Sequence, residues 1–378
     1  MSEILYKVNP DRNKPWNDLP ELPINPKLYR RVDIMERLGD AKASLARLQG
    51  RSAVIPDQGL LINTISLQEA KSSSAIENIF TTDDELYKAY SDQANDNTVK
   101  GASKEVLRYR EALWSGYHYL NENGRFDRDY FIETFQEIKQ SKDSIRPDFL
   151  LTTIRKGGSG IDAGEVVFTP PHGKDVVEHK LDNLIDFLNN DALYNIDHLL
   201  KMAIAHFQFE AIHPFRDGNG RTGRVMNINY LTSKNLLDYP ILFLSRYILD
   251  NKHDYYSGLM GVSQRGEWAA WLLFMLRAVE VTSDITFNKI NDIISAKDSI
   301  LDYLRKDERK FRNPERLIEY IFKQPFTKVR HLTDDGIYAE NTARDYLNRL
   351  CDVQVLEKRD IEGHHYYLNL ELYRILSE

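Results

Sequence analysis

Hydrophobic residues recur every three or four positions along most of the chain, which is the spacing of helices that bury one face. This pattern predicts helices from roughly Lys27 to Leu48 and from about Leu60 to Phe80. The apolar run from Ala269 to Leu276 is too short to span a bilayer and is expected to be a core helix. Further predicted helices contain Tyr109, Leu113 and Tyr117, then Phe131, Phe135 and Ile138, and then Leu200, Ala203, Ile204, Phe207 and Ala211. The fold class is therefore mainly α.

Two segments do not follow the helical pattern. Residues 150–171, LLTTIRKGGSGIDAGEVVFTPP, place β-branched residues on both sides of GGSG and predict a β-hairpin with a glycine-rich turn. After a charged stretch with proline, RKDERKFRNP at residues 305–314, the pattern predicts three helices and then two strands around a turn from Asp360 to Gly363. The C-terminal part is therefore expected to be a separate α+β module.

These changes of pattern divide the chain into four regions. Residues 1–104 form an N-terminal helical region with a proline-rich lead-in, and residues 105–285 form a helical core that includes the hairpin. Residues 286–312 form a linker helix, and residues 313–378 form the C-terminal module. A chain of 378 residues has room for such units, since domains usually hold about 100 to 200 residues.

The composition is that of a globular protein, with 42% hydrophobic and 28% charged residues. The formal net charge of −7 gives no overall attraction to nucleic acid. The single cysteine, Cys351, excludes an internal disulfide framework and is expected to be a small buried residue of a helix. The N-terminus shows no charged start followed by an apolar run, so we expect no signal peptide, no membrane association and a cytoplasmic location.

The densest chemistry lies in residues 213–224, HPFRDGNGRTGR. The glycines at 218, 220 and 223 satisfy the dinucleotide-binding pattern GxGxxG, but that pattern requires a preceding strand, and a helical pattern precedes it here. The glycine turn therefore joins two helices. Such a turn suits an anion, because its backbone N–H groups and the positive end of the following helix face the same point.

The charged residues of this stretch suit a site for displacement at a nucleotide phosphate. Arg221 and Arg224 share one face of the first helical turn, where both can reach the same polyphosphate. Asp217 suits a Mg²⁺ ion held by one carboxylate and by substrate phosphates. His213 has the pKa range of a general base. Four roles converge within twelve residues, which favours a functional site over packing or solvated surface.

The same stretch resembles the signature of the Fic family, HxFx(D/E)GN(G/K)RxxR, at every defined position. The resemblance implies a Fic-type helical bundle and transfer of AMP from ATP to a hydroxyl side chain of a protein. It implies that His213 deprotonates the hydroxyl, that Asp217 holds Mg²⁺ between the α- and β-phosphates, and that Phe215 anchors the loop. The α-phosphate would lie on Asn219 and the glycine turn, and the two arginines would bind the β- and γ-phosphates. The nucleotide-binding residues implied are Gly218, Asn219, Gly220, Arg221, Arg224, Tyr255 and Tyr256.

In Fic proteins a hairpin called the flap covers the site and pairs with the backbone of the target protein as an added strand. The hairpin at residues 150–171 takes that place ahead of the signature. Its lead-in, IKQSKDSIRPDF at residues 138–149, departs from the family's pattern, so no single flap residue is assigned a catalytic role. Of the two tyrosines, one is expected to pack in the core and the other to contact the adenine.

The segment SSAIEN, residues 73–78, matches the inhibitory motif (S/T)xxxE(G/N) of the Fic family through Ser73, Glu77 and Asn78. Its position ahead of the signature is that of the N-terminally autoinhibited class, with the inhibitory helix at about residues 60–80. If Glu77 pairs with Arg224, it occupies the donors that should hold the γ-phosphate. Some autoinhibited Fic enzymes use the same glutamate to remove AMP, so the direction of the reaction stays open.

The C-terminal module of three helices and a hairpin resembles a winged helix-turn-helix, which many Fic proteins of this length carry. Glu340 and Asp345 weaken a phosphate-facing surface, so a protein-contact or dimer module is favoured over DNA binding. The candidate DNA contacts on the helix from Ala339 to Cys351 are Asn341, Arg344, Asn348 and Arg349.

Two alternative functions stay open. One is removal of AMP, or transfer of another phosphate-derived group, on the same scaffold. The other is an ATP-sensing DNA-binding regulator, against which His213 argues because a sensor needs no base. Self-modification and a homodimer are also left open. A zinc site made of His206, Glu210 and His213 lacks the HExxH spacing and is rejected.

Overall fold

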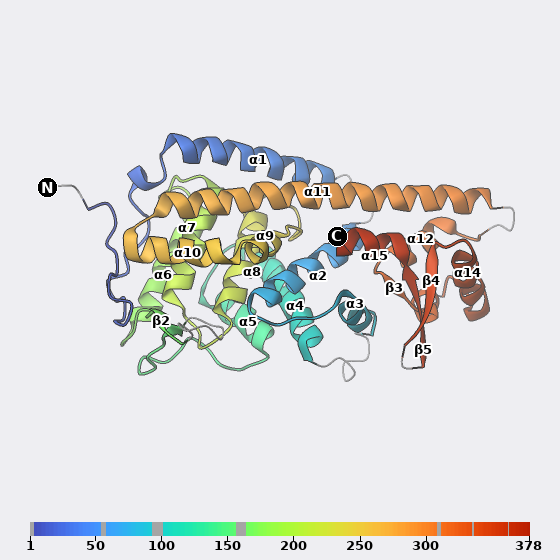
Figure 1. Ribbon diagram of the computed structural model, residues 1–378, viewed down its shortest axis with the longest axis horizontal. Helices are drawn as coiled ribbons and strands as arrows, with labels where there is room; N and C mark the ends of the chain where they lie inside the picture. The colour runs from blue at the N-terminus through green and yellow to red at the C-terminus, as the bar shows by residue number, and fades with distance from the viewer. Residues whose placement is uncertain are drawn as a thin grey trace.

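The computed structural model describes residues 4–53, 58–92, 101–155, 164–307, 311–334, 336–361 and 363–378, and of residues 58–62 the backbone alone. The molecule is elongated, with a helical core at one end, a small α+β module at the other, and one long helix, α11, that spans both (Figure 1). The mainly helical fold class predicted from the sequence is confirmed.

The core contains most of the helices and two short strands. In chain order its elements are the 3-10 turn Pro26–Leu28, α1 (Val32–Ala53), α2 (Gln58–Ile76), α3 (Asp83–Asp92), α4 (Gly101–Asn123), α5 (Arg128–Lys139), β1 (Ile154–Arg155), β2 (Val166–Phe168), α6 (Val176–Asn189), α7 (His198–Ile212), α8 (Asn219–Ser233), α9 (Leu244–Asp250), α10 (Lys252–Arg265) and α11 (Trp268–Lys306).

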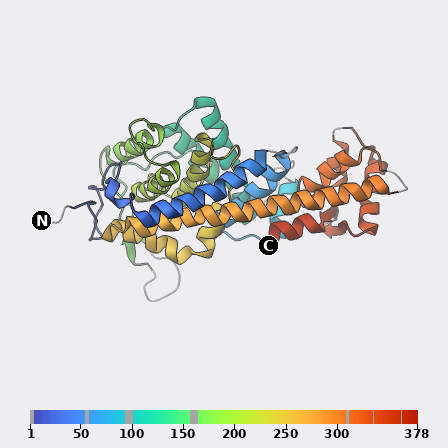
Figure 2. The ribbon, with the colours of Figure 1, turned by 90° about the horizontal axis from the view of Figure 1, so that it is seen from above.

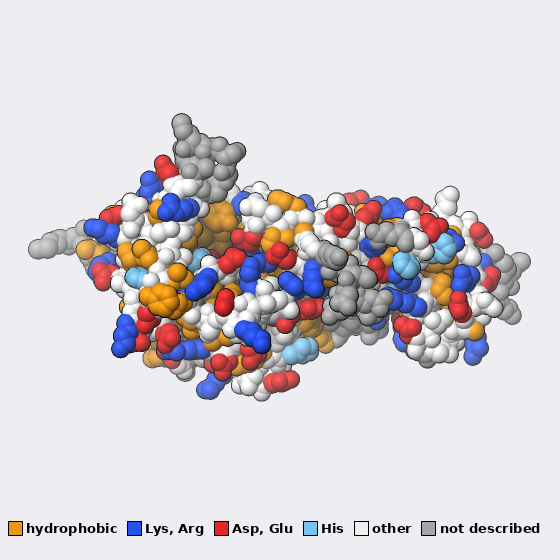
Figure 3. Space-filling model, turned by 90° about the horizontal axis from the view of Figure 1, so that it is seen from below, with side chains coloured by type: hydrophobic (Ala, Val, Ile, Leu, Met, Phe, Trp, Pro, Cys, Tyr) orange, Lys and Arg blue, Asp and Glu red, His pale blue; other side chains and the backbone are white. Residues whose placement is uncertain are grey.

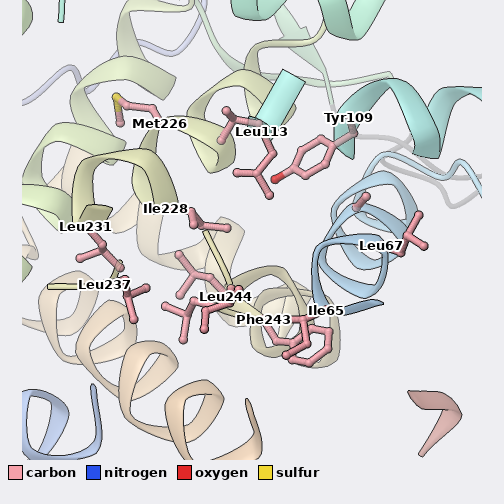
Figure 4. Close-up of a cluster of buried hydrophobic side chains, with 14 of the residues drawn as sticks. Ile65, Leu67, Tyr109, Leu113, Met226, Ile228, Leu231, Leu237, Phe243 and Leu244 are labelled. Atoms are coloured by element: carbon pink, nitrogen blue, oxygen red, sulfur yellow. The ribbon is translucent and has the colours of Figure 1, made fainter. Parts of the chain in front are cut away.

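Helices α7 and α8 form the centre of the core and are buried on nearly all sides. They pack on each other, while α4 and α5 cover α8 and α6 and α11 cover α7. Figure 4 shows Ile228 and Leu231 of α8 among side chains from α4, α2 and the start of α9. The apolar residues of α7 run around nearly the whole helix, whereas α8 also buries polar side chains such as Arg221, Arg224 and Asn227. The loop that joins the two helices is therefore held from several directions.

Helices α1 and α11 lie side by side along the length of the core (Figure 2). Arg37 of α1 pairs with Glu280 of α11 at 2.7 Å, and Arg51 donates to Asn291 at 2.7 Å. The start of α1 differs from the expected position near Lys27, because Asn25 accepts a hydrogen bond from the Lys27 N–H and caps a short 3-10 turn instead.

The hairpin expected at residues 150–171 consists of the antiparallel strands β1 and β2, with Ile154 opposite Phe168. The expected GGSG turn lies outside the described residues. Phe168 packs edge-on against Trp16 of the N-terminal lead-in, with ring centroids 5.9 Å apart. The lead-in therefore packs against strand β2 of the hairpin.

The C-terminal module has three helices, a three-stranded sheet and a terminal helix. Its antiparallel sheet has the order β3-β5-β4. The expected boundary at residue 285 falls inside α11, which runs without a break for 39 residues from the core into this module. The elements are α12 (Pro314–Phe322), β3 (Phe326–Thr327), α13 (Val329–Thr333), α14 (Glu340–Asp352), β4 (Leu356–Ile361), β5 (His364–Asn369) and α15 (Leu370–Ser377).

The module is also attached to α3 by charged side chains. Asp92 at the end of α3 forms an ion pair with Lys328 and accepts a hydrogen bond from the Tyr366 hydroxyl at 2.7 Å. Arg359 of β4 pairs with Asp84 at the start of α3, 3.2 Å away. The module therefore contacts the helix that directly follows the segment at residues 73–78.

None of the described helices combines the length and the apolar character that a membrane crossing needs.

A buried carboxyl group between α2, α4 and α9 gives a testable pH dependence. Burial raises the pKa of Glu69 to about 7, against the hydrogen bonds that it accepts from Ser245. The folded state therefore binds this proton more tightly than the unfolded chain, and stability is lost as pH rises from about 4.5 to 7, by at most about 3 kcal/mol. Glu69→Gln should remove this loss, because an amide does not ionise. The neighbouring hydroxyls of Ser245 and Tyr109 can accept from this amide, so it stays hydrogen-bonded.

The measurement is urea unfolding of wild type and Glu69→Gln at pH 5 and pH 8. The variant should gain stability relative to wild type at the higher pH, whereas the exposed Glu122→Gln should not. An equal difference between Glu69→Gln and wild type at both pH values would contradict the prediction.

Candidate phosphate-binding active site

His213 ends helix α7 in the left-handed conformation, with φ 51°, and its N–H donates to the Phe209 carbonyl at 2.9 Å. This geometry closes the helix and turns the chain towards the glycine-rich loop. The buried guanidinium of Arg146 fixes the turn, because it donates to the carbonyls of His213 at 2.8 Å and of Pro171 in the hairpin. Arg146 thus ties His213 to the end of the hairpin.

The loop from His213 to α8 is anchored by Phe215. Its ring stacks on Phe135 of α5, with centroids 4.3 Å apart and planes at 4°. The Asn219 side chain accepts from the Phe215 N–H at 2.9 Å and donates to its carbonyl at 2.8 Å. Both ends of this amide are therefore engaged within the loop, so that Asn219 would meet a phosphate through its backbone N–H.

The glycine turn needs glycine at two places for different reasons. Gly218 has φ 77°, in the left-handed region that side chains disfavour, and it precedes the first turn of α8. At Gly220 an added Cβ would lie 2.4 Å from Oε1 of Glu77 and 2.9 Å from Nη1 of Arg224. The backbone at Gly220 therefore lies directly against the Glu77 carboxylate and the Arg224 guanidinium.

Arg224 is almost completely buried and is held by Ser73 and Glu77. Its Nε donates to the Ser73 hydroxyl at 2.8 Å, and its Nη2 donates to the Ser73 carbonyl at 3.0 Å and to Glu77 at 2.8 Å. Ser73 and Glu77 therefore occupy the guanidinium from two sides. The side chain of Glu77 is 35% exposed, so it closes the pocket from the solvent side of Arg224.

The end of α2 explains why asparagine follows the glutamate. Asn78 has φ 62°, its N–H donates to the Ala75 carbonyl, and the Ile79 N–H donates to the Ser74 carbonyl, both at 3.0 Å. This is the Schellman ending of a helix, in which glycine or asparagine takes the left-handed position. Glu77 is therefore the C-cap residue just beyond α2, and the turn directs its side chain towards α8.

The other charged residues of the signature also have partners of opposite charge. Arg221, buried in α8, pairs with Glu105 of α4 at 3.1 Å. Asp217 pairs with Lys139, the last residue of α5, at 2.6 Å. Arg221 and Arg224, which are expected to bind phosphates, are thus each paired with a glutamate of this chain. Asp217, which is expected to bind the metal, is paired with a lysine.

One pocket of about 190 Å³ is lined by some of the predicted site residues, namely Glu77, His213, Gly220, Arg224, Tyr255 and Tyr256. The others, Ser73, Asn78, Asp217, Gly218, Asn219 and Arg221, are not part of its lining. Tyr255 is buried, with its hydroxyl 2.8 Å from Nε2 of His206, whereas Tyr256 is 42% exposed. Tyr255 thus packs in the core, and the expected contact of the other tyrosine with the adenine stays a prediction. The lining comprises Glu77, Ile154, Val167, Phe168, Phe207, Glu210, Ala211, His213, Gly220, Arg224, Tyr255, Tyr256, Leu259, Met260 and Ser263.

Burial sets the protonation of the groups around the pocket. It lowers the pKa of His213 to about 4, and the positive charge of Arg146 adds to this effect. It raises the pKa of Glu210, one helical turn before His213, to about 7. Partial burial works against ionisation of Asp217, but the hydrogen bond from Lys139 prevails and its pKa is lowered. At neutral pH the imidazole in the pocket is therefore neutral, and Asp217 on the adjoining loop is ionised.

Among the described residues, no three His, Cys, Asp or Glu side chains gather as ligands of one metal ion. A Mg²⁺ ion held by one carboxylate and substrate phosphates needs no such cluster. Asp217 fits this role, because its side chain is 71% exposed, carries hard oxygen donors and already attracts the ammonium group of Lys139.

The proposed DNA contacts on α14 are mostly engaged within the module. Arg344 pairs with Glu340 at 2.6 Å, Asn348 accepts from the Tyr367 hydroxyl, and Arg349 is buried with its guanidinium 3.8 Å from the ring centre of Phe311. Asn341 is exposed and Cys351 half-buried on the same helix. Acidic and basic side chains are interspersed over the face in Figure 3. This surface does not favour a polyanion.

Three residues that contact the site were not recognised from the sequence: Lys139, Glu105 and Arg146. Each comes from a segment more than 60 residues before its partner. The departure of the segment at residues 138–149 from the family's pattern was the one available signal, since it contains both Lys139 and Arg146.

Three family models match the chain in succession. The Fic/DOC family N-terminal model matches residues 35–118, and the Fic/DOC family model matches residues 125–231. The model for the C-terminal domain of SoFic-like protein adenylyltransferase matches residues 297–372. The chain belongs to the Fic/DOC family.

Its relatives include named adenylyltransferases. Protein adenylyltransferase fic-1 of Caenorhabditis elegans is 34% identical over 92 residues, which are 24% of this chain and 17% of that protein. Probable protein adenylyltransferase aq_aa38 of Aquifex aeolicus is 37% identical over 81 residues, 21% of this chain and 24% of that protein. The match thus spans about a fifth of the length of these curated relatives.

The fold is shared with solved Fic structures. The crystal structure of a Fic family protein from Desulfovibrio desulfuricans G20 superposes with a TM-score of 0.52 and 19% identity, over 92% of this chain and 98% of that one. Fic-1 of Caenorhabditis elegans superposes with a TM-score of 0.52 and 19% identity, over 69% of this chain and 74% of that one. At these identities the likeness concerns the fold.

Proposed function

We propose that this protein transfers AMP from ATP to a hydroxyl side chain of a protein, the activity for which its adenylyltransferase relatives are named. The observation that carries the proposal is that His213, the glycine turn at Gly220 and Arg224 line one pocket. A general base and a phosphate-binding helix terminus thus face the same space, as displacement at a nucleotide phosphate requires.

In this proposal His213 is the base. Burial keeps its imidazole neutral at pH 7, so that it can accept the proton of the target hydroxyl. The hydroxyl oxygen then forms a bond to the α-phosphorus, while the bond from this phosphorus to the oxygen that bridges to the β-phosphate breaks. Pyrophosphate leaves with that bonding pair. Mg²⁺ bound through Asp217 would supply stabilisation of the charge that develops on the leaving group.

The start of α8 holds the phosphates. Its first backbone N–H groups and the positive end of the helix favour the anion, and Gly220 lets the backbone approach it. Arg221 and Arg224 bind the β- and γ-phosphates after exchanging Glu105 and Glu77 for phosphate oxygens. The aromatic face of Tyr256 is the accessible surface on which the adenine can stack.

Glu77 inhibits the transfer in this proposal. While it holds Arg224, the γ-phosphate finds the guanidinium engaged and a carboxylate beside it. ATP then binds in a pose that does not align its α-phosphate with His213. The target protein docks on the flap at residues 150–171 by adding a strand to β1 and β2.

The test is retention of label by the denatured protein after incubation with Mg²⁺ and ATP labelled on either the α- or the γ-phosphate. AMP transfer predicts that α-label is retained, on the protein itself or on added targets, and that γ-label is not. Retention of γ-label would contradict the proposal and indicate phosphoryl transfer on the same scaffold. Release of label from an already AMP-modified target would instead support the removal of AMP.

A further inference from the structure

Lys139 contacts Asp217, the residue of the glycine-rich loop that is expected to bind the metal ion. It ends α5, and its Nζ is 2.6 Å from Oδ2 of Asp217. The stem of the side chain crosses the glycine turn, since a Cβ added at Gly218 would lie 3.2 Å from its Cγ and Cδ. The end of α5 is fixed against the loop by the stack of Phe135 on Phe215. The pairing is therefore built into the packing of α5 against the loop.

We propose that Lys139 is a resident counterion of Asp217: its ammonium group holds this carboxylate in the resting site, and the cation of a metal–nucleotide complex must displace it. The proposal rests on the function proposed above, in which Asp217 is the metal ligand. Lys139 is a positioning residue that acts through Asp217.

The geometry favours displacement over joint occupancy. An ammonium group and a divalent cation on the same carboxylate would repel each other, and Asp217 offers one further oxygen, which already accepts from the Gly218 N–H at 2.7 Å. The Lys139 side chain is 27% exposed and Asp217 71%, so the lysine can leave into solvent. Replacing Lys139 by the metal ion therefore costs little more free energy than breaking an exposed ion pair. Removal of the lysine is expected to strengthen metal binding severalfold.

The test is a thermodynamic cycle of nucleotide binding in the Glu77→Gly background, with α,β-methylene-ATP as the probe. Calorimetry gives its Kd with saturating Mg²⁺ and with EDTA. Lys139→Gln is expected to lower the Kd about three- to fivefold with Mg²⁺ and not with EDTA. In an Asp217→Asn background the same substitution should have no effect. Lys139→Arg should bind like the parent, and exposed Lys142→Gln serves as the matched control.

Each other outcome overturns the proposal. Weaker binding of Lys139→Gln both with Mg²⁺ and with EDTA would mean that the lysine attracts the phosphates directly. An unchanged Kd would mean that it does not compete with the metal, and an equal gain in the Asp217→Asn background would mean that Asp217 is not the shared ligand. Because the experiment measures binding, it tests this proposal even if the protein transfers no AMP. If the protein does transfer AMP but Lys139→Gln leaves every Kd of the cycle unchanged, the proposal is refuted.

Discussion

Glu77→Gly is expected to raise the rate of AMP transfer by about 10- to 100-fold. The variant removes a charge-assisted hydrogen bond to a buried guanidinium, an interaction of about 1.5–3 kcal/mol, and about 1.4 kcal/mol corresponds to a factor of ten. Arg224 keeps its bonds to Ser73 and so stays in position for the γ-phosphate. The measurement is the initial rate of α-label incorporation at saturating Mg²⁺ and ATP.

A matched control separates the carboxylate from the turn that carries it. Asn78→Gly keeps Glu77 and places glycine in the left-handed position that it favours, so its rate should stay within about twofold of wild type. Glu77→Gln, which keeps the length of the side chain, should activate less than glycine because its amide oxygen can still accept from Arg224. A well-folded Glu77→Gly protein with an unchanged or lower rate would remove the basis for autoinhibition.

His213→Ala, measured in the Glu77→Gly background to give a large starting signal, should lower the rate of AMP transfer about 100- to 10,000-fold. A positioned general base contributes about 100- to 10,000-fold, and water that replaces the imidazole is a far weaker base. ATP binding should change little, because the phosphate contacts come from α8 and its arginines. The experiment therefore compares label incorporation with the Kd of a non-hydrolysable nucleotide.

The exposed residue His179 provides the control for this substitution, since His179→Ala removes an imidazole that pairs with Glu21 on the surface of α6. It should transfer AMP at the parent rate. If His213→Ala keeps transfer within about tenfold of its parent while binding ATP, another group takes the proton. Glu210, one turn earlier on α7 and also in the pocket, would then be the next base to examine.

The candidate site residues could be picked out from the sequence because most of them lie close together in the chain. Twelve consecutive residues carry His213, the glycine turn and both arginines, and a short motif about 140 residues earlier carries Glu77. Local rules also apply at the end of α2, where Asn78 takes the left-handed position. Such features depend on neighbours in sequence and can be read without the fold.

The partners of these residues could not be predicted in the same way. Glu105 reaches Arg221, and Lys139 reaches Asp217, only because α4 and α5 pack against α8. A lysine at the end of an amphipathic helix is usually solvated surface, and nothing in its own segment names its partner. The position of the C-terminal module against α3 depends in the same way on contacts between distant segments.

Helix α11 sets both the distance of the C-terminal module from the core and the direction in which the module faces around the helix axis. A helix turns about 100° for each residue, so one residue inserted near Ala296 would swing everything beyond it by more than a quarter of a circle while lengthening it by only about 1.5 Å. The faces that carry Lys328 and Arg359 would then point away from α3. An insertion of seven residues, close to two full turns, would restore these directions but move the module along the axis by about 10.5 Å, so the ion pairs with α3 are expected to be lost in that case as well.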